Sequence, residues 1–159
     1  MDPWNSPELR RRLDLALESH RHWTGRDLVP DLAAPGTEAR YESLWSMPRV
    51  LVSHGTQDDP VFWYGNRAAL KLWEFDWETF TRTPSRFTAE APLREERARL
   101  LDRVTRHGFI DDYAGIRISR TGKRFRIRQA VVWTLRNEPD EHGGTAGQAA
   151  SFTDWEFLT

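Results

Sequence analysis

In the stretch Val61-Phe-Trp-Tyr-Gly-Asn-Arg-Ala-Ala-Leu-Lys-Leu-Trp73, a strand pattern changes into a helical pattern within two residues. The short apolar run at its start favours a β-strand, and Asn66 is a residue type that caps helices. We therefore expect a helix from Arg67 to Glu74. On the N-terminal side, Arg49 to Ser53 predicts the preceding strand. The last third of the chain predicts a long antiparallel meander, so the order of the elements indicates an α+β fold.

The composition is that of one domain with little net charge and no cysteine. The chain has 159 residues and a formal net charge of -1, so no overall field favours nucleic acid or an anionic membrane. The lack of cysteine excludes disulfides, thiolate catalysis, iron–sulfur clusters and thioether-linked chromophores. The N-terminus lacks the basic and apolar regions of a signal peptide, and no apolar run approaches the ~20 residues of a membrane span. We therefore expect a cytoplasmic protein that binds neither nucleic acid nor membranes.

Two segments are predicted from the patterns along the chain. Residues 1–40 are expected to form a helix and a loop, and residues 41–159 the main domain. Ser6 can cap a helix and proline suits its first turn, which predicts a helix from Pro7 to about His22. We expect this helix either to lie on the free face of the sheet or to pair with a second subunit of a homodimer. It carries an apolar stripe at helical spacing, which predicts dimer contacts through Leu9, Leu13 and Leu17.

The predicted meander contains one strand with a clear alternation. Between Arg124 and Leu135, apolar residues are expected on one face and arginines on the other. Gln129 is a polar exception on the apolar face, and Gln148 lies in the neighbouring closing strand. An amide that points into an apolar interior needs a partner, which could be a ligand, a water or another side chain.

Aromatic residues and these two amides could together form the wall of a ligand pocket between sheet and helices. The same residues could equally form a densely packed core, because large aromatic surfaces are costly to leave in water. The chain has eight tryptophans, which is enough aromatic surface for either interpretation. The candidate ligand-binding residues are Tyr64, Trp73, Phe87, Tyr113, Gln129, Trp133, Gln148 and Phe152.

Basic residues crowd the hairpin around the turn Arg120-Thr-Gly-Lys123. One interpretation is a clamp for a phosphate or a carboxylate, since guanidinium groups bind both in a bidentate manner. The other is an exposed sheet face, or a face paired with acidic residues of the first helix. Nucleic-acid binding would normally bring a larger positive excess. The candidate anion-binding residues are Arg117, Arg124, Arg126 and Arg128.

No group of residues indicates catalysis. Ser53-His54-Gly55, followed by Asp58 and Asp59, has the residue types of a hydrolytic or metal site. Its spacing fits no metal-ligand pattern, and Gly55 and Pro60 are typical of a turn. The sequence also has no glycine-rich phosphate loop and no nucleophile elbow. We therefore expect no catalytic residue and no metal, and the sequence identifies no cofactor.

Several long strings follow one another along the chain. They include Val52-Ser-His-Gly-Thr56, Phe62-Trp-Tyr-Gly-Asn-Arg-Ala-Ala-Leu70, Gly108-Phe-Ile-Asp-Asp-Tyr-Ala-Gly-Ile-Arg-Ile-Ser119 and Gly147-Gln-Ala-Ala-Ser-Phe152. Together they resemble the MEKHLA domain family, which is PAS-like, over roughly Tyr41 to the C-terminus, and the chain is similar to the short, stand-alone bacterial form. The resemblance implies an antiparallel sheet of about five strands, with helices packed on one face and a helical extension at the N-terminus.

The resemblance implies a sensory or regulatory domain. Such a domain would bind a small ligand or a protein partner and pass the change on through dimer or partner contacts. Flavin-binding PAS domains use a reactive cysteine, which this chain lacks, so light-driven adduct chemistry is not expected. Two alternatives remain open. One is a small enzyme or binding protein for an acidic metabolite that uses the arginine-rich hairpin, and the other is a protein-interaction module with a filled core.

Overall fold

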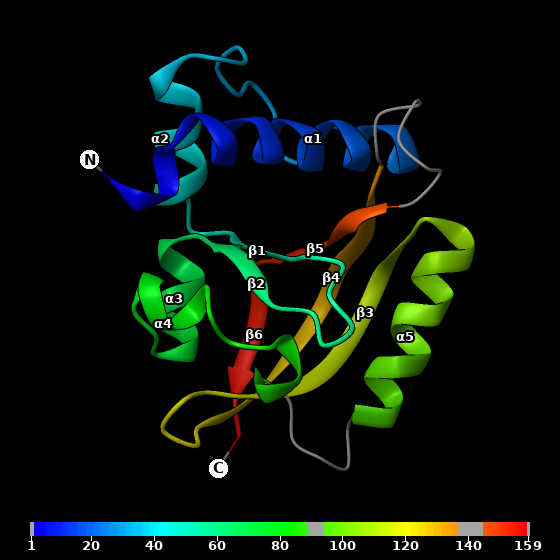
Figure 1. Ribbon diagram of the computed structural model, residues 1–159. Helices are drawn as coiled ribbons and strands as arrows, with labels where there is room; N and C mark the ends of the chain where they lie inside the picture. Colours follow the sequence, from blue (N-terminus) through cyan, green and yellow to red (C-terminus); the bar gives the residue numbers. More distant parts are fainter. Residues whose placement is uncertain (1, 89–93, 137–144, 159) are drawn as a thin grey trace.

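The structure is a computed structural model that describes residues 2–88, 94–136 and 145–158. Figure 1 shows helices on both sides of one antiparallel sheet. The α-helices are α1 (Pro7–Thr24), α2 (Glu38–Ser46), α3 (Arg67–Trp73), α4 (Trp77–Phe80) and α5 (Arg94–His107). The 3-10 helices are η1 (Pro3–Asn5) and η2 (Ser85–Thr88). The strands are β1 (Val50–His54), β2 (Phe62–Gly65), β3 (Phe109–Ile118), β4 (Arg124–Arg136), β5 (Thr145–Phe152) and β6 (Asp154–Phe157).

The sheet has the strand order β2-β1-β5-β4-β3, with every neighbouring pair antiparallel. The sixth strand, β6, also pairs with β4, because the predicted closing strand is interrupted at Thr153. β5 therefore pairs with Val131–Arg136 of β4, and β6 with Phe125–Arg128. The predicted α+β architecture is confirmed, with one strand more than the five or so expected. No helix within the described ranges has the length and apolar character needed to cross a membrane.

Side-chain caps begin several helices, and those at Ser6 and Asn66 are at the positions that the sequence predicted. The Ser6 hydroxyl accepts a hydrogen bond from the Leu9 N–H at 3.2 Å, which starts α1. The Asp76 carboxylate accepts one from the Thr79 N–H at 2.7 Å, which starts α4. Each cap satisfies a backbone donor that has no partner inside its helix, so the local sequence is enough to place these helix starts.

Asn66 is both a cap and a junction between three elements. It is fully buried, and its Oδ1 accepts hydrogen bonds from the N–H groups of Ala69 in α3 and Leu51 in β1. Its Nδ2 donates to the carbonyls of Leu44 in α2 and Arg49. Every hydrogen-bonding position of this buried amide is thus used, which fixes α2 and α3 against the start of the sheet.

Helix α1 packs across one face of the sheet, mainly on β4 (Figure 1). Leu13 and Leu17 are buried there, and the Trp133 indole N–H donates to the Ala16 carbonyl at 2.8 Å. The predicted role of Leu13 and Leu17 as dimer contacts is therefore corrected, because the apolar face of β4 already covers both side chains. Leu9 is only partly buried. Homodimer formation itself stays a prediction.

The other face of the sheet is covered by α3, α4, η2 and α5. Phe125 and Ile127 of β4 pack on this side, whereas Trp133 and Leu135 pack beneath α1. The prediction that these residues share one face is wrong. A β-bulge at Gln129, whose φ is 51°, inserts one residue into β4 and reverses the alternation beyond it.

Candidate functional site

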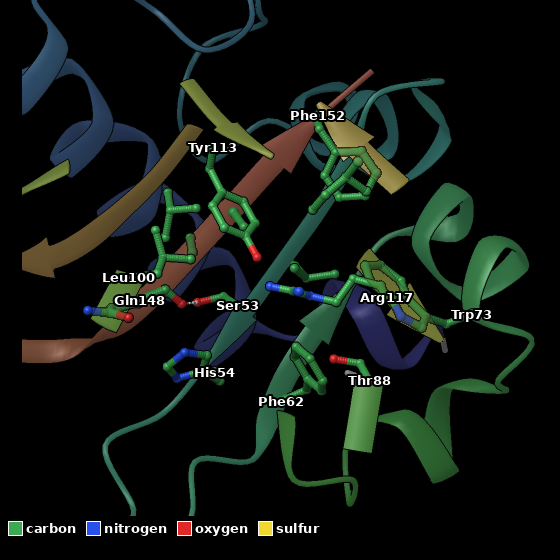
Figure 2. A pocket seen from close by; sticks show the side chains of 15 residues that line it. Ser53, His54, Phe62, Trp73, Thr88, Leu100, Tyr113, Arg117, Gln148 and Phe152 are labelled. Carbon is green, nitrogen blue, oxygen red and sulfur yellow. Dashed lines mark hydrogen bonds between the residues drawn. The ribbon is translucent and has the colours of Figure 1, made fainter. Parts of the chain in front are cut away.

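A cavity of about 60 Å³ lies between the sheet and the helices that follow β2 (Figure 2). Strands β1 to β5 contribute to its wall, together with the end of α3, η2 and α5. A cavity of about 150 Å³ holds a benzene molecule, so this space as it stands accepts only a few non-hydrogen atoms. Much of the lining is apolar and includes Val52, Phe62, Leu100, Ile127, Val132 and Phe152.

Two buried polar atoms of lining residues have no hydrogen-bond partner among the described residues. They are Nε1 of Trp73, at the end of α3, and Oε1 of Gln148, in β5. The backbone around Gln148 is well anchored, because its carbonyl accepts a hydrogen bond from the Ser53 hydroxyl at 2.7 Å (Figure 2). Buried polar groups in proteins are nearly always paired, so these two atoms indicate that water or a ligand completes the site.

Arg117 is the buried charge of the cavity. Its exposed fraction is 8%, and its Nη1 donates to the carbonyl of Ile116 at 3.0 Å. Its guanidinium carbon lies 5.2 Å from the centre of the Tyr113 ring. No carboxylate of the described residues forms an ion pair with it. Figure 2 shows its guanidinium extending into the middle of the lining side chains.

Alternation along β3 places Arg117 in the cavity. Tyr113, Gly115 and Arg117 are two residues apart, so their side-chain positions fall on one side of the strand. A Cβ atom on Gly115 would collide with the Tyr113 hydroxyl and lie 3.3 Å from Nη1 of Arg117. The glycine therefore leaves the space in which the tyrosine hydroxyl and the guanidinium approach each other.

The structure brings together Trp73, Tyr113, Gln148 and Phe152 of the eight predicted pocket residues. Tyr64 and Trp133 lie instead in the core beneath α1. For Trp133 the cause is the bulge in β4. For Tyr64 the cause is a bulge in β2. Ser53 pairs with Tyr64 and the next residue, His54, pairs with Phe62, so Trp63 is an extra residue in β2.

The two remaining candidates are solvent-exposed. Half of Phe87 is accessible to solvent, in contact with Arg86. Gln129 is exposed at the bulge, where its backbone turns the side chain away from the interior. Burial also raises the pKa of the Tyr64 hydroxyl well above its usual value, but this group lies in the core under α1 and not at the cavity.

The predicted arginine cluster is divided between the two faces of the hairpin. Arg117 pairs with Phe125, which faces the interior, whereas Arg124, Arg126 and Arg128 point to the outer face. Arg126 and Arg128 both contact the Glu156 carboxylate of β6, Arg126 at 4.0 Å. These four residues therefore do not form one clamp, because adjacent positions in paired strands alternate between faces.

The Ser53-His54 and Asp58-Asp59 group is explained by local structure. The Ser53 hydroxyl donates to a backbone carbonyl, and Nδ1 of His54 lies 3.0 Å from the Gly55 carbonyl oxygen. Asp59 forms an ion pair with Arg86 at 3.0 Å. Within the described part of the chain, no group of three or more His, Asp or Glu side chains is arranged to hold a metal ion.

Comparisons with known proteins agree with this architecture. The sequence model of the MEKHLA domain matches residues 10–157, which include most of α1. A PAS domain from Colwellia psychrerythraea is similar in structure, with a TM-score of 0.59 and 13% identity over 76% of this chain and 94% of that one. A PAS domain from a two-component sensor histidine kinase gives 0.55 and 11% over 74% and 91%. The LOV domain of a blue-light activated histidine kinase from Erythrobacter litoralis gives 0.50 and 15% over 70% and 97%. No curated protein matches the sequence significantly.

Proposed function

Because this chain belongs to the MEKHLA domain family and has a PAS-like fold, we propose that it is a sensory domain that binds a small ligand in the cavity between sheet and helices. The family and the fold support a sensory or regulatory role. The ligand and the way in which binding is transmitted are our proposals, and both rest on the residues around the cavity.

The observation that carries the proposal is the pair of buried polar atoms without partners, Nε1 of Trp73 and Oε1 of Gln148. Leaving a buried donor or acceptor unpaired costs about 1–3 kcal/mol, and two such groups in one small cavity double that cost. A ligand, together with any water it retains, would have to offer one acceptor and one donor to remove both penalties. Figure 2 has these two side chains on opposite sides of the Arg117 guanidinium, so a small ligand would pair directly with one of them and through water with the other.

Binding could be transmitted through β4, because neighbouring residues of this strand face different layers. Val132 lines the cavity, and the next residue, Trp133, is hydrogen-bonded to the Ala16 carbonyl of α1 on the other side. A ligand that binds one arrangement of β4 better than another would shift the population of that arrangement. We propose that the exposed side of α1 passes this shift to a second copy of the chain or to another protein.

The test combines native mass spectrometry with a matched pair of variants. The freshly purified protein is weighed under native and then denaturing conditions, and a non-covalent mass lost on denaturation is the expected result. Gln148→Asn withdraws the unpaired amide from the cavity and should remove this mass. Gln129→Asn makes the same chemical change at an exposed residue whose left-handed backbone suits asparagine, and should retain it. If the native and the denatured protein have the same mass, and no added small molecule raises the melting temperature, ligand binding is contradicted.

A protein-interaction module with a filled core is the second candidate. The cavity of about 60 Å³ favours it, since a few waters could fill this space and pair with the two orphaned atoms. This candidate predicts a clean apo mass and an unchanged melting temperature with small molecules. It also predicts one protein partner, whose binding is lost when exposed residues of α1 are changed.

A further inference from the structure

We infer that the ligand is a small monocarboxylate whose carboxylate group pairs with the buried guanidinium of Arg117. This inference rests on the proposed function, because it names the chemical class of the molecule that occupies the same cavity. It goes beyond that function in committing to the sign of the ligand's charge, to its size and to the residue that anchors it.

The charge balance of Arg117 favours an anion. Arg117 is 8% exposed as a whole residue, so its side chain has lost most of its hydration, and a buried charge without a counter-ion is strongly unfavourable. The contact with the Tyr113 ring compensates only part of this loss. The hydrogen bond to the Ile116 carbonyl uses one of five N–H donors. An anion in the cavity would supply both the missing charge and the missing acceptors.

The donors around the guanidinium also suit a carboxylate. The Tyr113 hydroxyl and Nη1 of Arg117 both border the space that Gly115 leaves open. A planar fork of N–H groups with a hydroxyl next to it is the arrangement that binds the two oxygens of a carboxylate. The unpaired indole N–H of Trp73 is a further donor in the wall. The site therefore offers donors where an anion would need them.

The lining also favours a ligand with one charge and a short apolar body. Among the described lining residues, Arg117 is the only arginine or lysine, whereas a phosphate ester would carry close to two negative charges. The lining also includes Val52, Phe62 and Ile127, which suit an alkyl group. Butyrate has as many non-hydrogen atoms as benzene, so the cavity of about 60 Å³ must widen to admit it, and would have to widen far more for a large aromatic cofactor.

The experiment compares sodium butyrate with its neutral analogue butanamide and with inorganic phosphate, by calorimetric titration of protein freed of bound ligand by refolding. The expected result is that butyrate binds at least tenfold more tightly than either of the other two. Equal binding of butanamide, or tighter binding of phosphate, overturns the inference. Because this comparison uses the unmodified protein, it does not depend on any variant folding.

Two arginine variants then locate the anchor. Arg117→Gln should weaken butyrate binding at least tenfold, and Arg117→Lys, which keeps the charge but loses the planar fork, should weaken it less. Arg126→Gln is the matched control, because Arg126 lies on the outer face beside Glu156, and it should change the affinity less than twofold. Unchanged butyrate binding in folded Arg117→Gln, checked by circular dichroism, contradicts the assignment.

Failure of this inference can be told apart from failure of the proposed function. If the mass released in native spectrometry is a neutral compound, retained in Arg117→Gln and lost in Gln148→Asn, the sensory cavity stands and the carboxylate assignment is wrong. If no compound is released and neither butyrate nor butanamide binds, both proposals are wrong and the filled-core alternative takes their place.

Discussion

The indole N–H of Trp133 donates to the carbonyl of Ala16 at 2.8 Å, in a fully buried contact between β4 and the middle of α1. The neighbouring residue, Val132, faces the cavity on the other side of the sheet. One peptide unit therefore separates the candidate ligand site from the N-terminal helix. This short connection is the physical basis for expecting that a change in the cavity alters how α1 is held.

Replacing Trp133 by phenylalanine should cost more stability than the same change at Trp73. Both indoles are buried and both variants lose ring volume, but only Trp133 also loses a hydrogen bond. A net hydrogen bond is worth about 1 kcal/mol, so Trp133→Phe should lower the free energy of unfolding by about 1 kcal/mol more than Trp73→Phe. Urea denaturation followed by circular dichroism measures both values. Equal losses would show that the hydrogen bond to Ala16 contributes nothing.

Leu13→Asp should destabilise the fold rather than only separate subunits. Leu13 is 1% exposed, and a carboxylate at this position would be buried against the apolar face of the sheet. We expect a loss of at least about 3 kcal/mol in unfolding free energy. Arg11→Asp, on the exposed side of the same helix, is the control and should change stability little. If Leu13→Asp keeps its melting temperature and light scattering shows a change from dimer to monomer, the stripe is an intersubunit surface after all.

Gln148→Leu should stabilise the ligand-free protein while impairing binding. The side-chain oxygen is buried without a partner, and replacing such a group by an apolar one of similar size removes a desolvation penalty. The expected gain is about 1 kcal/mol in unfolding free energy, measured on protein freed of bound compounds by refolding. A loss of that size instead would mean that Gln148 is paired in solution, for instance with a buried water.

Glu74 should make stability fall at acidic pH. Its carboxylate accepts hydrogen bonds from the Thr121 and Ser119 hydroxyls and is paired with Lys123, and the hydroxyls above all lower its pKa from 4.5 to about 2. For an acid with a depressed pKa, the stabilisation is complete above the unfolded value and is lost as the proton binds. Glu74 thus contributes above pH 4.5, and this contribution disappears between pH 4.5 and about 2.

The matched variant is Glu74→Gln, which cannot change its charge in this range. Melting temperatures measured from pH 6 down to about 2 should fall less steeply for the variant than for the unmodified protein. The remaining slope includes Asp76, whose pKa is also lowered, chiefly by the hydrogen bond from the Thr79 N–H. Parallel curves for the two proteins would show that the hydrogen bonds from the β3–β4 turn do not hold in solution.

Some predictions about the candidate site failed because a strand carries an extra residue. Tyr113 and Gln148 line the cavity, although the strand register shifts on both sides of Tyr113 and just before Gln148. Trp133 lies beyond the bulge at Gln129, and a single inserted residue moves every later side chain to the other face. The sequence shows that Arg117 lies near the other arginines of the hairpin, which is why one anion site was predicted. It does not show that Arg117 faces the interior while the others face outward.

By itself, the sequence determined the order of the main helices and strands, β6 excepted, and the starts of α1 and α3. Caps such as Ser6, Asn66 and Asp76 act over three residues, and strand patterns are read within one segment, so both are local properties of the chain. Only the tertiary structure decided which face each side chain joined. That choice follows from pairing between distant strands. A bulge in β2 puts Tyr64 under α1, and pairing opposite Phe125 leaves Arg117 buried without an acidic partner in the described chain.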